Sequence, residues 1–257
     1  MKLRLAALLA CMALSAPLAA QQFDTISFGV DGGYPPFDVL APSGEITGFD
    51  IDIANALCTQ LKAKCVFVKQ PFESMIAALN AHKFDAIIAS LNMTDARKKE
   101  VDFTDRYYRS AAQLVARKGS PLLPEVASLK GKTVGVQTGS THEAFAKANW
   151  ANHGGKIVSF ANQDNVYLDL LSGRIDAALQ DNIQAATGFI DTPRGQKFAF
   201  AGPVIQDGGI SSDVGIAVNK DNPALRDALN GAIRAIRADG TYDAIQKKYF
   251  SFDIYGK

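Results

Sequence analysis

The chain has 257 residues and a nearly balanced charge, with 27 Lys and Arg against 26 Asp and Glu. This length can hold two modest domains or one large one. The charge balance argues against a nucleic-acid partner, because no basic stripe is present and pairs such as Lys98-Lys99 are typical of solvated surface.

The first 20 residues have the features of a targeting segment rather than of a folded element. Lys2 and Arg4 give a positive start, and an uninterrupted apolar run fills 5–14. That run is shorter than the roughly 20 residues that a membrane-spanning helix needs. We therefore predict a signal peptide at 1–20, cleaved after Ala20, and an exported protein with no later membrane span.

Cysteine usage agrees with export. Residues 8–11 could alternatively be a lipoprotein box with Cys11 acylated, but this would leave a very short apolar region and is less favoured. Cys58 and Cys65 remain as an even pair, separated by the polar segment 59–64. A disulfide between them is favoured in an oxidising compartment, and the alternative is two buried free thiols. No metal site is predicted, because no ligand spacing links the cysteines with His82, His142 and His153.

Strands and helices alternate through the first part of the mature chain. Apolar residues at every second position predict a strand at 26–30, and 31–37 is a turn that neither a strand nor a helix can continue through. The elements predicted next are a helix at 50–61, a strand at 65–68, a helix at 71–80, a strand at 84–89, a polar loop at 92–97 and an extended stretch at 101–103.

The same pattern restarts after an extended crossing at 113–117. Strands are predicted at 133–137, 157–160, 175–179, 197–201 and 214–218, and helices at 141–149, 165–171, 223–238 and 242–249, with Gly240 as a C-cap. Such alternation predicts an α/β fold with mostly parallel sheets covered on both faces. The predicted lobes are 21–110 together with 207–257, which holds the returning strand and the last helices, and 111–206.

Two segments look like copies of one unit. Residues 79–90 and 170–181 each contain a helix end, a polar turn with a basic residue, and an apolar strand that opens with Asp-Ala. The first copy ends on Ser90 and the second on Asp181. Because ligands bind at the carboxyl ends of strands in open α/β sheets, the repeat predicts two similar lobes that offer polar groups to one cleft.

Several side chains near these strand ends can bind a ligand. Arg97 could hold a carboxylate through two parallel hydrogen bonds, or be a surface arginine. Asp181 could accept from an ammonium group, cap a helix at 182–190, or do both. Tyr34 and Phe72 could be core residues, or flat walls on either side of a ligand.

The turn at 138–141 joins a strand to a helix and is rich in Gly, Ser and Thr. Free N–H groups at the start of a helix attract anions, and Ser140 or Thr141 could donate to such an anion or simply cap the helix. A phosphate loop is not expected, because the Gly-Lys-Ser/Thr ending that it requires is missing.

Five short segments carry a resemblance to a known family, and it extends over the whole mature chain. They are 48–52 (GFDID), 85–91 (DAIIASL), 94–97 (TDAR), 128–132 (SLKGK) and 238–242 (ADGTY). The chain resembles the periplasmic solute-binding proteins of polar amino-acid ABC transporters, and is most similar to the lysine/arginine/ornithine and histidine branch. The resemblance implies a two-lobed type II periplasmic-binding-protein fold, with a hinge between the lobes and the ligand in the interlobe cleft.

The resemblance also implies a role for each candidate residue. Arg97 would hold the α-carboxylate of an amino acid, Asp181 would accept from its α-ammonium, and Asp31 would face a cationic side-chain end. Tyr34 and Phe72 would sandwich the aliphatic part. A buried zwitterion needs both charges paired, because an unpaired charge costs several kcal/mol. Ser90, Leu91, Asn92 and Thr141 would assist at the α-carboxylate and α-ammonium, and Gln137 and His142 complete the implied site.

Four residues depart from the family pattern. Ala89 and Asn92 stand where serine is frequent, Gln137 stands where an apolar residue is frequent, and His142 stands where glutamine is frequent. Asn92 is polar, so binding of a carboxylate can survive. The other three departures could suit a longer or doubly charged ligand, such as an amino-acid conjugate of the opine kind.

The expected function is reversible binding of arginine, ornithine, lysine or histidine in the periplasm by a monomer that closes its two lobes and passes the ligand to an ABC permease. No cofactor and no catalysis are expected. One alternative is an enzyme like cyclohexadienyl dehydratase on the same scaffold, against which the ammonium acceptor at Asp181 argues. Another is a sensory protein that docks on a receptor.

Overall fold

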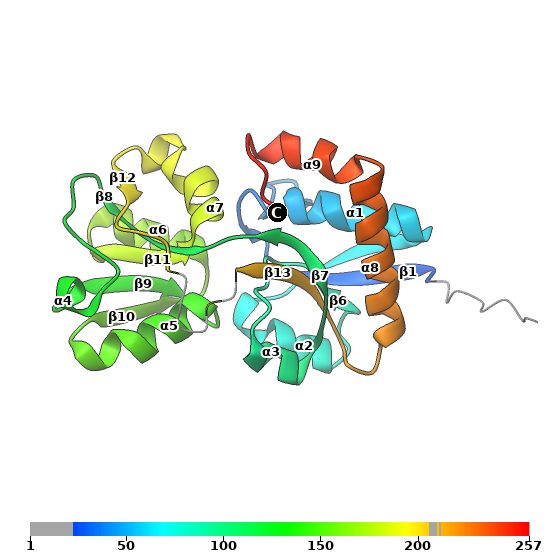
Figure 1. The fold of residues 1–257 in the computed structure, drawn as a ribbon, viewed down its shortest axis with the longest axis horizontal. Helices are drawn as coiled ribbons and strands as arrows, with labels where there is room; N and C mark the ends of the chain where they lie inside the picture. The colour runs from blue at the N-terminus through cyan, green and yellow to red at the C-terminus, as the bar shows by residue number, and fades with distance from the viewer. Residues whose placement is uncertain (1–22, 206–209, 211, 257) are drawn as a thin grey trace, which may run out of the picture.

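The computed structural model describes residues 23–205, 210 and 212–256. The predicted signal peptide at 1–20, Cys11 and the predicted lobe boundary at 206/207 lie outside the described residues. The chain forms two α/β lobes that lie side by side (Figure 1). Among the described residues, no helix combines the length and apolar character that crossing a membrane requires.

The first lobe is built on a five-stranded sheet in which one strand runs against the others. Its order is β5 (Lys64–Lys69), β1 (Thr25–Val30), β6 (Ala86–Ile87), β13 (Asp213–Val218) and β7 (Asp102–Arg109). Only β13 is antiparallel to its neighbours. The helices of this lobe are α1 (Phe49–Leu61), α2 (Met75–Asn80), α3 (Asp95–Glu100), α8 (Pro223–Ala238) and α9 (Thr241–Tyr249).

The second lobe repeats this arrangement. Its sheet has the order β10 (Lys156–Phe160), β9 (Thr133–Gln137), β11 (Ala177–Asp181), β8 (Ala112–Arg117) and β12 (Phe198–Phe200), and β8 runs against the rest. Its helices are α4 (Val126–Leu129), α5 (Thr141–Asn149), α6 (Gln163–Ser172) and α7 (Asn182–Ala185), which continues as a π-helical turn at Ala186–Ile190. The predicted two-lobed α/β fold is confirmed.

The internal repeat is visible in the hydrogen bonds as well as in the strand order. β6 and β11 occupy the centre of their sheets, and each is preceded by the aspartate of an Asp-Ala pair. The Ser27 N–H of β1 donates to Asp85 Oδ2 at 2.8 Å, and the Thr133 N–H of β9 donates to Asp176 Oδ2 at 2.8 Å. Each aspartate therefore ties its central strand to the start of the neighbouring parallel strand.

The spacing of apolar residues explains which faces of the strands and helices are buried. Ile26, Phe28 and Val30 are fully buried in β1, as their alternation predicts. In α8, the buried side chains Leu225, Leu229 and Ile233 recur every four residues and therefore face the sheet as one stripe. Between α1 and β5, Cys58 and Cys65 form the predicted disulfide, with their Cα atoms 5.9 Å apart.

The two lobes are joined by adjacent segments of the chain. The Ser110 N–H, just after β7, donates to the Ser212 carbonyl at 2.9 Å. Ala112, at the start of β8, forms an isolated antiparallel bridge with Ile205. These contacts place the described ends of the second crossing beside the first.

Several local predictions were wrong or incomplete. The predicted loop at 92–97 contains the start of α3, which begins after Thr94 because the Thr94 hydroxyl accepts from the Arg97 N–H at 3.2 Å. The strand predicted at 84–89 is reduced to β6. The sequence patterns also missed a small antiparallel sheet of β2 (Gly33–Tyr34), β3 (Asp38–Leu40) and β4 (Ile46–Thr47).

Candidate functional site

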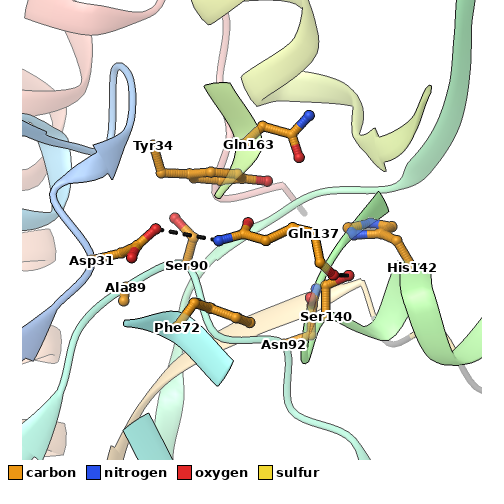
Figure 2. A pocket seen from close by; sticks show the side chains of 10 residues that line it. All are labelled: Asp31, Tyr34, Phe72, Ala89, Ser90, Asn92, Gln137, Ser140, His142 and Gln163. Atoms are coloured by element: carbon orange, nitrogen blue, oxygen red, sulfur yellow. Dashed lines mark hydrogen bonds between the residues drawn. The ribbon is translucent and has the colours of Figure 1, made fainter. Parts of the chain in front are cut away.

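A small cavity lies between the lobes, at the carboxyl ends of their parallel strands (Figure 2). Its volume is about 20 Å³, which is room for about one water molecule. Admission of anything as large as an amino acid therefore requires the lobes or the lining side chains to move. The lining residues are Asp31, Tyr34, Phe72, Ala89, Ser90, Asn92, Gln137, Ser140, His142 and Gln163.

Seven of the eleven predicted site residues line this cavity: Asp31, Tyr34, Phe72, Ser90, Asn92, Gln137 and His142. Arg97 and Thr141 lie beside it and contact Asn92. Asp181 is buried at the end of β11 and is not among the lining residues. The Leu91 side chain packs in the hydrophobic core of the first lobe, so a role in binding would fall to its backbone.

Asp31 directly follows β1, and a neighbouring aspartate shapes the turn that carries it. Asp38 accepts from the Asp31 N–H at 3.2 Å and from the Tyr34 N–H at 3.2 Å. The turn thereby presents both Asp31 and Tyr34 to the cavity. Burial raises the pKa of Asp31, and a hydrogen bond from Gln137, with Nε2 3.3 Å from Asp31 Oδ2, opposes that rise.

Ser90 has a backbone conformation that its surroundings impose. Its φ is +54°, in the left-handed region that non-glycine residues seldom adopt. The Ser90 N–H donates to Asp50 Oδ2 at 2.9 Å, and the Tyr107 hydroxyl donates to Asp50 Oδ1 at 2.9 Å. Burial raises the pKa of Asp50 to about 7. The buried Asp50 carboxyl thus holds the Ser90 backbone in place at the cleft.

Arg97 projects from α3 toward the second lobe. Its guanidinium donates to the Asn92 carbonyl at 3.0 Å and to the Gly139 carbonyl at 3.1 Å, and it lies 5.7 Å from the centre of the Phe72 ring. Burial lowers the pKa of Arg97 to about 10, so the group is still a cation at neutral pH. No carboxylate among the described residues pairs with it. Thr141, at the start of α5, donates to Asn92 Oδ1 at 3.2 Å.

Asp181 caps α7, which was one of its two predicted roles. Its Oδ1 accepts from the Ile183 N–H at 2.8 Å and from the Gln184 N–H at 2.9 Å. Burial raises the pKa of Asp181 to about 6, opposed by hydrogen bonds from Ser110 and from the start of α7. The cap orients the carboxyl at the end of the strand, in the position that corresponds to Ser90 in the first lobe.

His142 lies in the first turn of α5 and lines the cavity, and its imidazole makes no hydrogen bond with any described residue. Burial, and then the nearby Arg97, lower its pKa to about 3, so the imidazole is neutral at physiological pH. A neutral imidazole can donate from one ring nitrogen and accept at the other.

Three lining residues were not among the predicted site residues. Ala89 was singled out as a departure from the family pattern, and Ser140 as a helix cap, which is confirmed because its hydroxyl accepts from the Glu143 N–H at 3.1 Å. Gln163 opens α6, two residues before the predicted helix start. Nothing in the local sequence distinguishes it from a surface glutamine.

Comparisons with known proteins identify the family of this chain. Residues 26–252 match the profile of the bacterial extracellular solute-binding proteins, family 3. The chain is 46% identical over 234 residues to the lysine/arginine/ornithine-binding periplasmic protein of Escherichia coli K12, covering 91% of this chain and 90% of that protein. It is also 46% identical over 232 residues to the histidine-binding periplasmic protein of Salmonella typhimurium, covering 90% of this chain and 89% of that protein.

Among solved structures, an ancestral arginine-binding protein bound to arginine is similar with a TM-score of 0.82 and 35% identity, covering 90% of this chain and 100% of that one. The family match and the identity over nine-tenths of the chain confirm the resemblance inferred from the sequence. This chain belongs to the bacterial extracellular solute-binding proteins of family 3.

Proposed function

We propose that this protein reversibly binds a basic L-amino acid, namely arginine, ornithine, lysine or histidine, by closing its two lobes. The observation that carries the proposal is the chemistry at the cleft. The cleft offers a buried carboxyl, Asp31, and a half-buried guanidinium, Arg97, which no carboxylate among the described residues neutralises. The names of the related proteins, which bind lysine, arginine, ornithine or histidine, support the same ligand class.

In this proposal each charged group of the ligand has one partner. Arg97 receives the α-carboxylate with help from Thr141 and the backbone at 90–92, and Asp181 accepts from the α-ammonium. Asp31 faces the cationic side-chain end, and Tyr34 and Phe72 pack on the aliphatic part. Because the anchors belong to both lobes, the ligand favours the closed arrangement by its differential affinity for it.

The cellular setting follows from the same family. We propose export to the periplasm with cleavage after Ala20, lobes at 21–110 with 207–257 and at 111–206, and a monomer that delivers its ligand to the permease of an ABC importer. The proteins compared above are binding proteins, which favours reversible binding over catalysis on this scaffold.

Calorimetric titration tests the proposal. The mature protein, unfolded and refolded to remove any carried ligand, is titrated with arginine, lysine, ornithine, histidine, glutamine, glutamate and an arginine-derived opine. Tight binding confined to the cationic amino acids is expected. Binding of the opine alone, or of no member of the panel, would refute the ligand assignment, and consumption of a ligand would refute the binding role.

Two variants separate the anchors. Arg97→Ala should weaken every amino-acid ligand by roughly 2–5 kcal/mol, because it leaves the ligand carboxylate buried and unpaired. Asp31→Asn should weaken arginine by a similar amount and glutamine far less. Lys98→Ala is the matched control, since Lys98 lies next to Arg97 on α3 but is exposed. Equal losses for arginine and glutamine in Asp31→Asn would show that Asp31 does not face the side chain.

A further inference from the structure

A buried row of hydrogen bonds leads from the cavity to the contact between the lobes. Gln163 Nε2 donates to Gln180 Oε1, Gln180 Nε2 donates to the Tyr167 hydroxyl, and that hydroxyl donates to Gln184 Oε1. Gln184 Nε2 then donates to the Pro35 carbonyl at 2.9 Å. The four side chains belong to the second lobe and are at most 2% exposed, whereas Pro35 belongs to the first lobe. We call these four side chains the glutamine relay.

The Pro35 carbonyl sets the direction of every bond in the relay. A carbonyl can only accept, so Gln184 must turn its NH₂ group toward Pro35 and its oxygen toward Tyr167. Burial raises the pKa of Tyr167, so its hydroxyl stays protonated and donates to Gln184. The hydroxyl oxygen then accepts from the NH₂ group of Gln180, which leaves the Gln180 oxygen to accept from Gln163.

The end of the relay at the cavity is therefore an acceptor. One N–H of Gln163 donates to Gln180, so its NH₂ group lies on the side of Gln180 and Oε1 lies on the other side of the carboxamide. Gln163 lines the cavity, and no described residue donates to that oxygen. Figure 2 shows the Gln163 oxygen on the side of Gln137 and His142, and its nitrogen pointing away from them.

We propose that Gln163 is a ligand-binding residue that accepts a hydrogen bond from an N–H donor of the bound amino acid, and that Gln180, Tyr167 and Gln184 are its positioning residues. The inference rests on the proposed function. It narrows the ligands to those that place a hydrogen-bond donor, either an ammonium or a guanidinium group, next to the Gln163 oxygen. An acceptor-only group such as a carboxylate would meet the Gln163 oxygen unfavourably. The relay thus adds discrimination between basic and acidic amino acids.

The relay also depends on closure. Pro35 can approach Gln184 this closely because Gly188 has no side chain, since a Cβ there would lie 2.2 Å from the Pro35 oxygen. When the lobes separate, the Pro35 carbonyl no longer orients Gln184. Closing the cleft therefore fixes the acceptor face of Gln163 at the moment at which the ligand becomes enclosed.

The direct test is the affinity of Gln163→Leu for L-arginine, measured by calorimetry. Loss of a hydrogen bond to a charged donor should weaken binding by roughly 10- to 100-fold. Unchanged affinity in a folded variant would overturn the inference and leave the proposed function standing. Failure of the wild-type chain to bind any basic amino acid would instead refute the proposed function, and the inference with it.

The positioning role is tested by Tyr167→Phe, which keeps the ring stacked on Phe189, with centroids 4.0 Å apart, and removes only the hydroxyl. Arginine affinity should fall in the wild-type background and remain unchanged when the variant is added to Gln163→Leu. Equal losses in both backgrounds would show that Tyr167 acts independently of Gln163.

Tyr242→Phe provides the matched control. It removes a buried hydroxyl that donates to the Tyr107 carbonyl at 2.7 Å, outside the relay. It should change thermal stability and leave arginine affinity unaltered. A loss of affinity as large as that of Tyr167→Phe would mean that any buried tyrosine hydroxyl matters equally, which contradicts a specific relay.

Discussion

Gln137 Nε2 lies 3.3 Å from Asp31 Oδ2, and the two residues occupy equivalent places in the two lobes. Asp31 follows β1 and Gln137 ends β9, each the second strand in the order of its sheet. Figure 2 shows the Gln137 carboxamide between the rings of Tyr34 and Phe72, where we propose that the ligand side chain lies. The second lobe thus places a neutral amide against the carboxyl that should select a cationic ligand.

Removing this amide should strengthen binding. In Gln137→Leu a ligand no longer has to displace the contact with Asp31, so the affinity for L-arginine should rise by about 1 kcal/mol, the usual net value of one hydrogen bond. Calorimetry on both chains measures the change. Weaker binding by the variant would show that the Gln137 amide contacts the ligand itself.

The strand ends could be predicted from sequence because they follow from periodicity and from the repeated Asp-Ala strands. Asp31, Ser90 and Gln137 line the cavity because each lies at or just after the carboxyl end of a parallel strand. A polar residue at such a position predicts a binding site, because the geometry of each sheet brings the carboxyl ends of its parallel strands to one edge.

Other parts of the site depend on contacts between distant segments and could not be predicted. Arg97 was placed in a loop because the six-residue α3 carries no buried side chain and so leaves no apolar period. Gln163 reaches the cavity only because α6 packs beside the β2 turn of the other lobe. Asp50 was part of a family motif, but its support of Ser90 requires a hydrogen bond across 40 residues.

The close approach of Gly188 to Pro35 predicts a variant that keeps the cleft open. Gly188 does not have a positive φ, so its backbone can accept alanine, and the one close contact of the new Cβ within the second lobe would be Gln184 Nε2 at 2.7 Å, the end of a side chain that can shift. Its Cβ would meet the Pro35 oxygen at 2.2 Å, which disfavours closure. Arginine affinity should fall by at least about 1.4 kcal/mol, or tenfold, and small-angle X-ray scattering should show a larger radius of gyration.

The control for this closure test is Gly231→Ala in α8, where an added Cβ would meet no atom within 4 Å. This change should raise helix stability slightly and leave affinity unchanged. An unchanged affinity of Gly188→Ala for arginine would mean that the lobes close less tightly around the ligand than they do in this structure.

The disulfide should act on stability alone. Cys58 and Cys65 close a short loop between α1 and β5, so replacing both with alanine should lower the free energy of unfolding by about 2–3 kcal/mol. Neither cysteine lines the cavity, so arginine affinity should not change. Urea unfolding and calorimetry on the same samples measure the two quantities, and a loss of affinity would tie the α1–β5 junction to the site.

Asp50 should give the free energy of unfolding a pH dependence of known sign. Burial raises its pKa from an ordinary value of 3.8 to about 7, so between these values the folded chain binds a proton that the unfolded chain does not. The stabilisation that this bound proton gives the folded chain is complete below pH 3.8 and is lost as the pH rises through about 7.

The test of this pH dependence is urea unfolding of the wild type and of Asp50→Asn at pH 5, 6, 7 and 8. His142, whose lowered pKa acts in the opposite direction, is common to both chains and cancels in their difference. The wild type should lose stability relative to Asp50→Asn as the pH rises. A difference that is constant with pH would mean that Asp50 is ionised throughout and holds Ser90 as a carboxylate.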